Sequence, residues 1–274
     1  MNISDKIFQT VKSLGKVVLQ SRRPTVSSSA DGGRIIVMGN GPSLNSTIDA
    51  HMDLLCSVPT MAVNFAANAP VFAKLRPRYY VLADPHFFSG ASDANLELLW
   101  KSLRSVDWAM TLFVPASLVS KVRTILGPGT VAVEGFNAVG AEGFDCISDV
   151  LYRLNLAMPR PRNVLIPAIM LAIAVGFREI DIVGADHSWM KTLSVSDDNE
   201  VVSVQEHFYT DGAEEKARVR HEYKGYRLHM IVESFAVAFR SYIDIARYAS
   251  KRGIRIFNCT PGSFIDAFPR CELH

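Results

Sequence analysis

Residues 34–46, RIIVMGNGPSLNS, have the residue types and order that suit the binding of a phosphate or nucleotide. The apolar run at 35–38 is typical of a strand buried on both faces of a parallel sheet. Gly39 and Gly41 allow a tight turn and a close approach by a ligand, and Ser43 can cap a helix or contact that ligand. A strand, a glycine turn and a helix start present backbone N–H groups to an anion. An ordinary tight turn is the alternative, since the spacing matches neither the dinucleotide fingerprint nor the P-loop.

Polar side chains follow several of the predicted strands. Asn40, Asn64 and Asp84 each come directly after or close to an apolar run, and Asp186 and His187 follow a fourth. In open parallel sheets, ligands bind outside the carboxyl ends of the strands. These five residues therefore predict a binding site, although Asn and Asp also favour ordinary turns.

Histidines supply the candidate general bases. His207 and His221 lie in a polar, poorly periodic segment at 190–226, and His229 follows near the start of a long helical pattern. Imidazole, with an unperturbed pKa of about 6.5, can accept a proton at neutral pH. A surface or core role is the alternative for each. A metal site formed by Asp186, His187 and His207 would match no standard spacing, and the chain has no Asp-x-Asp pair, so we expect chemistry without a metal.

The elements that must position these residues alternate along the chain. Strands are predicted at 35–38, 59–63, 79–83, 110–114, 131–133, 179–183 and 254–257, and helices at 44–55, 97–106, 146–154, 166–175 and 228–251. This order predicts an α/β fold with a doubly wound, mostly parallel, Rossmann-like sheet. A long irregular segment in such a domain is often functional, so residues 190–226 are predicted to form a lid before the last long helix.

Residues 1–33 are predicted to precede a catalytic domain at 34–274. Apolar residues recur at helical spacing over 3–20, interspersed with lysines. A helix packed on the domain or on a partner is favoured, and a basic amphipathic helix on an anionic membrane is the alternative. Residues 24–33 have the Ser- and Gly-containing composition of a flexible linker.

Composition narrows the class of protein. The 274 residues are 49% hydrophobic with a net charge of +2, which argues against global disorder and a nucleic-acid partner. The four cysteines have no zinc spacing and suit reduced thiols in a cytosolic protein. No apolar run reaches the roughly 18 residues that span a bilayer, and no secretory signal is recognisable.

Four motifs resemble those of a known enzyme family. GNGPSL at 39–44 resembles the nucleotide-binding motif of bacterial lipooligosaccharide sialyltransferases, glycosyltransferase family 42. DPHFF at 84–88 resembles the family's Asn-Pro-x-x-Phe-Phe turn. AIAVGFREIDIVGAD at 172–186 resembles its buried helix, strand and Gly-x-Asp end, and residues 258–263 take the place of its Cys-Pro-Asn-Ser turn. The same features are similar to a broader family named after an archaeal hydroxymethylpterin diphosphokinase, which includes flagellin-modifying glycosyltransferases.

The resemblance implies roles for individual residues. Asn40, Ser43 and Asn64 would hold a CMP donor, and Tyr209 would hold the donor phosphate. His229 fits best the place of the catalytic histidine, with His221 second. The family's third-strand Asn is replaced here by Asp84, which accepts hydrogen bonds but cannot donate them. A Ser-Gly pair before the buried helix is also absent, so the donor can differ from CMP-sialic acid.

The predicted function is therefore a cytoplasmic glycosyltransferase of bacterial surface-polysaccharide or lipopolysaccharide assembly, located in the cytoplasm or at the inner face of the plasma membrane. It would move a sialic-acid-like or other sugar from a nucleotide donor, a CMP-sugar being favoured, to a glycan acceptor. One alternative is a pterin diphosphokinase, in which Asp84 and Asp186 would hold Mg²⁺ with ATP. The other is a non-enzymatic nucleotide-binding scaffold that docks through residues 1–20.

Overall fold

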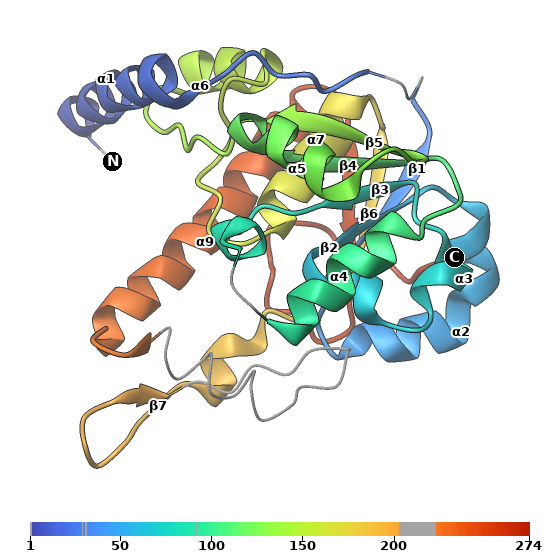
Figure 1. Ribbon diagram of the computed structural model, residues 1–274. Helices are drawn as coiled ribbons and strands as arrows, with labels where there is room; N and C mark the ends of the chain where they lie inside the picture. Colours follow the sequence, from blue (N-terminus) through green and yellow to red (C-terminus); the bar gives the residue numbers. More distant parts are fainter. Residues whose placement is uncertain (1, 29, 31, 91–92, 203–222) are drawn as a thin grey trace.

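The computed structural model of the chain describes residues 2–28, 30, 32–90, 93–202 and 223–274 (Figure 1). Within these residues, seven parallel strands form one sheet in the order β5-β4-β3-β2-β1-β6-β9. The strands are β1 (Arg34–Met38), β2 (Thr60–Val63), β3 (Tyr79–Val81), β4 (Met110–Pro115), β5 (Val131–Phe136), β6 (Glu179–Val183) and β9 (Arg255–Asn258).

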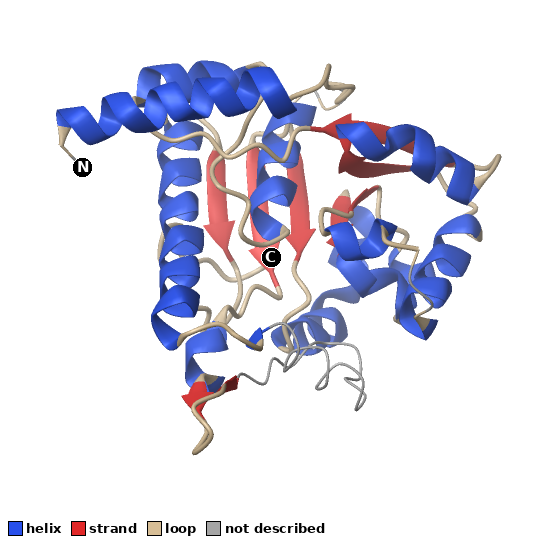
Figure 2. Ribbon diagram, turned by 60° about the vertical axis from the view of Figure 1, so that its left-hand side comes forward, coloured by secondary structure: helices blue, strands red, loops and turns tan. Residues whose placement is uncertain are grey.

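Helices cover both faces of this sheet, because β1 sends successive apolar side chains into opposite layers. Ile35 and Val37 pack with α6 (Asp145–Arg153), α7 (Leu165–Val175) and α9 (Leu228–Ser250). Ile36 and Met38 pack on the other face with α2 (Ser43–Ser57), α3 (Phe72–Leu75), α4 (Ala94–Arg104) and α5 (Val119–Leu126). Figure 2 shows the strands between these helical layers. The predicted doubly wound, Rossmann-like α/β fold is thus confirmed.

The direction of chain travel across the sheet reverses at β1. From β1 the chain moves outward through β2, β3, β4 and β5, and it then returns to place β6 on the other side of β1. The connections on the two sides of β1 therefore diverge. A crevice for a ligand is expected outside the carboxyl ends of the strands at such a switch point.

Short elements follow the strand ends. The 3-10 helices η1 (Asn64–Asn68), η2 (Pro85–Phe88), η3 (Ala116–Leu118) and η4 (Ser188–Thr192) come after β2, β3, β4 and β6. The segment predicted as irregular at 190–226 continues instead with a hairpin of β7 (Ser194–Val195) and β8 (Val201–Val202). The remainder of the predicted lid, at 203–222, lies outside the described residues.

The N-terminal segment contacts the body of the protein through hydrogen bonds. After α1 (Ile3–Gln20), the Ser21 hydroxyl donates to Leu156 O and the Thr25 N–H to Gly135 O. Further along, the Ala30 N–H donates to Val175 O. Thr25 and Ala30, two described residues of the predicted linker, are thus tied to β5 and α7, and the division of the chain at residues 33 and 34 stays a prediction. No described helix has both the length and the apolar character needed to cross a membrane.

Candidate functional site

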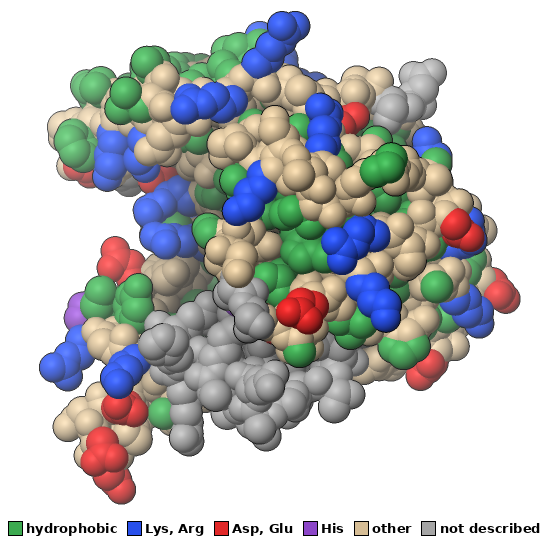
Figure 3. All heavy atoms as spheres, viewed as in Figure 1, with side chains coloured by type: hydrophobic (Ala, Val, Ile, Leu, Met, Phe, Trp, Pro, Cys, Tyr) green, Lys and Arg blue, Asp and Glu red, His purple; other side chains and the backbone are tan. Residues whose placement is uncertain are grey.

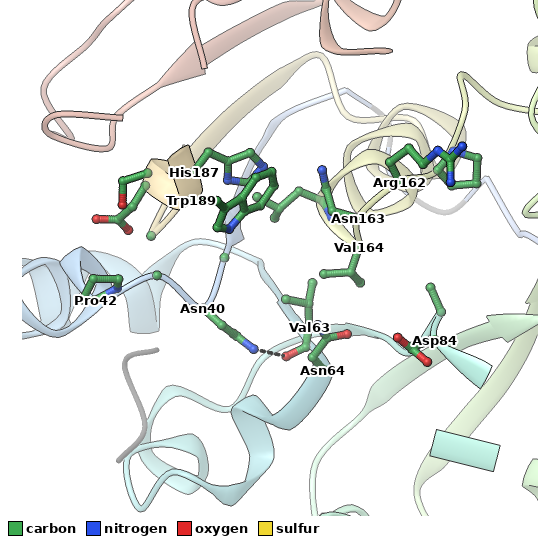
Figure 4. A pocket seen from close by; sticks show the side chains of 18 of the residues that line it. Asn40, Pro42, Val63, Asn64, Asp84, Arg162, Asn163, Val164, His187 and Trp189 are labelled. Carbon is green, nitrogen blue, oxygen red and sulfur yellow. Dashed lines mark hydrogen bonds between the residues drawn. The ribbon is translucent and has the colours of Figure 1, made fainter. Parts of the chain in front are cut away.

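A cavity of about 550 Å³ opens at the carboxyl ends of β1, β2, β3 and β6. Its volume is within the range of about 300–1,000 Å³ that small-molecule sites occupy. Figure 4 shows side chains from these four strand ends and from the loop before α7 gathered around it. The predicted residues that line it are Gly39, Asn40, Gly41, Asn64, Asp84, Asp186 and His187.

Three asparagines on the cavity wall each have a buried polar atom without a hydrogen-bond partner. The Asn40 amide nitrogen donates to Val63 O at 3.1 Å, as Figure 4 shows, and its Oδ1 has no partner. The same holds for Oδ1 of Asn64 and for Nδ2 of Asn163. A buried polar atom left in this state costs about 1–3 kcal/mol. A ligand with both donor and acceptor groups would satisfy all three atoms.

Asn163 also holds two neighbouring groups in place, one of them on the buried Tyr242 behind the wall. Its Oδ1 accepts the Leu165 N–H at 3.0 Å and the Tyr242 hydroxyl at 2.9 Å. Since Oδ1 can only accept, the hydroxyl of Tyr242 donates its proton there and accepts from Nε2 of His187, 2.7 Å away. This fixes the tautomer of a neutral His187, with the proton on Nε2 and a lone pair on Nδ1.

Burial determines the charge state of His187. The ring lies within an aromatic group, with its centroid 4.2 Å from that of Trp189, and desolvation lowers the pKa of His187 to about 3. Burial also raises the pKa of Tyr242. At neutral pH His187 is therefore an uncharged hydrogen-bonding group and a weak base, and it supplies no positive charge to a phosphate.

The glycine turn packs against the loop after β6. The prediction that its N–H groups are free to bind an anion is wrong for both glycines. The Gly39 N–H donates to Val183 O and the Gly41 N–H to Gly184 O, both at 2.8 Å. A Cβ on Gly41 would overlap the carboxylate of Asp186. These glycines are needed chiefly because two strand-end loops approach each other closely, and their N–H groups are not available to an anion.

Ser43 also has a different role from the predicted ligand contact. It does not line the cavity, and its hydroxyl donates to Oδ2 of Asp186 at 2.7 Å. The start of α2 brings this hydroxyl behind the carboxylate, so Ser43 positions Asp186. Asp84, the other carboxylate of the wall, accepts the His86 N–H through Oδ1 at 2.8 Å, and its Oδ2 makes no hydrogen bond with a described residue.

Cationic side chains line the same cavity as these carboxylates. Arg162 and Lys191 both line it, together with Trp189 and Asn163. Sequence patterns did not single out Lys191, Trp189 or Asn163 as site residues. The signal that could have found Asn163 is its place just before a buried helix, where an Asn caps the first N–H groups.

The predicted catalytic histidines are not brought to this cavity by any described contact. His229 is exposed as the second residue of α9 and does not line the cavity. His207, His221 and Tyr209 lie outside the described residues, so their roles stay predictions. Across the described ranges, no three His, Cys, Asp or Glu side chains come together as a metal site.

A second cavity of about 580 Å³ adjoins the first. The two share Arg162, Asn163 and Trp189. The second cavity is otherwise lined by aromatic, polar and apolar residues from the start of α9 and the residues before it, among them Tyr223, Tyr226, Glu233, Ser234 and Phe235. The shared wall would allow two ligands to meet beside Trp189.

Comparison with known proteins adds a structural neighbour. No protein-family model matches the sequence, and no curated protein matches it. The fold is similar to the solved structure of MAf glycosyltransferase from Magnetospirillum magneticum AMB-1, with a TM-score of 0.52 and 13% sequence identity. This chain has a glycosyltransferase-like fold. The match covers 99% of this chain and 39% of that one, so this chain corresponds to about two fifths of the neighbour's length. The narrower resemblance to glycosyltransferase family 42 stays a prediction.

Proposed function

We propose that this chain is a glycosyltransferase that binds a nucleotide-sugar donor at the carboxyl ends of β1, β2 and β3. The observation that carries the proposal is the set of three unpartnered amide atoms, of Asn40, Asn64 and Asn163, on the wall of a cavity at the switch point. The glycosyltransferase-like fold supports the reaction class.

The donor and acceptor character of the wall matches the parts of a nucleotide sugar. Oδ1 of Asn40 and of Asn64 would accept hydrogen bonds from a base or a ribose hydroxyl, and Oδ2 of Asp84 would accept from another hydroxyl. The cations Arg162 and Lys191 would bind the phosphate. The sequence resemblance supports a CMP-sugar with a sialic-acid-like sugar, and a role in surface-polysaccharide assembly.

In the proposed reaction, a hydroxyl of the acceptor glycan attacks the anomeric carbon of the donor. The new C–O bond forms as the bond from that carbon to the phosphate oxygen breaks, and the nucleotide leaves with both electrons. Arg162 and Lys191 would stabilise the charge that develops on the leaving phosphate.

The proton of the acceptor hydroxyl goes to Asp186 in this scheme. A hydrogen bond from Ser43 orients this carboxylate, and the same loop carries Trp189, which lines both cavities. Carboxylates serve as general bases. Asp186 takes precedence over the predicted base His229, because His229 is exposed on α9 and does not line the cavity.

A panel of nucleotides tests the function. We expect CMP, CDP or UDP to raise the melting temperature of the full chain without a divalent cation, and the matching nucleotide sugar to be consumed when a glycan acceptor is added. Stabilisation by ATP only with Mg²⁺, followed by pyrophosphate transfer to a pterin, would establish the kinase instead. No response to any nucleotide would contradict the proposal and support the scaffold role.

A further inference from the structure

Helix α1 turns small polar residues toward the body of the protein. Thr10 and Ser13 are its buried residues. The Ser13 hydroxyl donates to Glu142 O at 3.0 Å and accepts the Glu142 N–H at 2.9 Å, while Oγ1 of Thr10 accepts the Phe144 N–H at 2.9 Å. These bonds fix which face of the helix points inward, so α1 is held in one rotation about its axis.

Most apolar residues of α1 consequently point to solvent, although Val17 packs against the core. Ile3, Ile7, Phe8, Val11, Leu14, Val18 and Leu19 are 40% to 80% exposed. With about 100° between successive residues, they occupy a single arc of the helix. Figure 3 shows apolar side chains gathered along this helix. We call these seven residues the α1 apolar face. A contiguous exposed patch of this kind marks an interaction surface.

Basic residues accompany the α1 apolar face. Lys12 and Lys16 are next to it on the helix, and Arg22 and Arg23 follow the helix end. Residues 1–23 contain five basic residues and one acidic residue, whereas the rest of the chain has 24 basic and 26 acidic residues. The positive charge of the protein is thus concentrated at this helix, where Figure 3 shows basic side chains beside the apolar ones.

We propose that the α1 apolar face lies on an anionic lipid bilayer, with the helix axis in the plane of the interface. An apolar face flanked by lysines suits such a position, in which the apolar face enters the boundary between headgroups and acyl chains. A second copy of the chain fits less well, because pairing two α1 apolar faces would bring the lysines of both helices together. The proposal is independent of the proposed enzymatic function.

Sedimentation of the full chain with vesicles tests the proposal. We expect binding to vesicles of phosphatidylcholine mixed with phosphatidylglycerol, and little binding to phosphatidylcholine alone. The double variant Phe8→Glu, Val11→Glu should lose binding, because it puts carboxylates into the part that enters the lipid. Leu98→Glu is the control for a carboxylate at an exposed apolar position away from α1, since Leu98 is a 44% exposed leucine on α4, and it should bind like the wild type.

Charge removal provides a second, graded measurement. Lys12→Gln with Lys16→Gln should weaken binding to the anionic vesicles by roughly 25-fold, because each lysine near such a surface contributes about fivefold. Melting temperatures of all variants should remain close to that of the wild type.

Three outcomes would overturn the proposal. The first is unchanged vesicle binding by the Phe8→Glu, Val11→Glu variant. The second is equal binding to neutral and anionic vesicles. The third is the absence of vesicle binding by the wild type. If sedimentation equilibrium then finds a dimer that the double variant dissociates, the α1 apolar face is assigned to a second copy of the chain.

Discussion

The substitution Asn40→Ala separates ligand binding from folding, because the structure offers a matched control in Asn68. Asn40 donates through Nδ2 to Val63 O at 3.1 Å and has a buried, unpartnered Oδ1. Asn68 donates through Nδ2 to Asn95 O at 2.9 Å, and its Oδ1 is also buried without a partner. Only Asn40 lines the cavity.

The effect on folding should be small and similar for the two variants. Each alanine loses one neutral hydrogen bond, with a net contribution of about 1 kcal/mol, and removes one unsatisfied oxygen whose burial costs about 1–3 kcal/mol. These terms oppose each other. We therefore expect the free energy of unfolding to change by about 1 kcal/mol or less in Asn40→Ala and in Asn68→Ala, as measured by urea denaturation.

The effect on ligand binding should differ sharply. In Asn40→Ala the nucleotide loses an acceptor and leaves a donor of its own unpaired, which costs about 1–3 kcal/mol, or roughly 5- to 150-fold in Kd. Isothermal titration with the nucleotide that stabilises the wild type measures this change. Asn68→Ala should keep the wild-type Kd. Equal affinities of a folded Asn40→Ala variant and the wild type would refute the assignment of Asn40 to the site.

Three further perturbations test other parts of the structure. Asp186→Asn should lower turnover by about 10²–10⁴-fold with donor affinity nearly unchanged, while His229→Gln stays close to wild type; the opposite pattern in steady-state kinetics would return the base to His229. The folded-state pKa of His187 is lowered to about 3. The contribution of the neutral ring to the free energy of unfolding is therefore complete above the unfolded-state pKa of about 6.5 and declines as the pH falls toward 3. At pH 4.5 the free energy of unfolding is lower by about 3 kcal/mol. Urea denaturation across this pH range should show a shallower dependence for His187→Gln, and parallel curves would contradict the burial argument. Gly41→Ala should lower the melting temperature markedly because its Cβ would overlap Asp186, whereas Gly15→Ala, with open space around it on α1, should have little effect or stabilise by up to about 1 kcal/mol; similar melting curves for the two variants would contradict the role assigned to Gly41.

Local sequence patterns predicted much of the fold. The unbroken apolar run at 35–38 predicted a strand buried on both faces, and it lies inside the sheet as β1, flanked by β2 and by β6, the strand predicted at 179–183. The polar residues after the strands predicted the position of the cavity, because all parallel strands end at the same edge. These signals are local: they depend on the side-chain period of a strand and on the turn preferences of Asn, Asp and Gly.

The polar chemistry of the cavity wall depends on contacts that no local pattern contains. Tyr242 lies 79 residues from Asn163 and 55 from His187, and their hydrogen-bonded chain forms only when α9 packs over α7. That packing removes His187 from water and keeps it neutral, which its sequence neighbours do not indicate. The hydrogen bonds of Gly39 and Gly41 could not be predicted from local sequence either, because their N–H groups donate to carbonyls at the end of β6 and in the loop after it.

Helix α1 shows most clearly what the sequence determines and what the tertiary structure adds. Its sequence alone determines an amphipathic helix, because apolar and basic residues alternate with the period of 3.6. Which face turns inward was decided by Thr10 and Ser13, whose hydroxyls satisfy backbone groups at residues 142 and 144. A hydroxyl that pairs with a buried N–H removes the cost of leaving that group unsatisfied. The tertiary structure therefore holds the polar side of α1 inward and leaves its apolar side in contact with solvent.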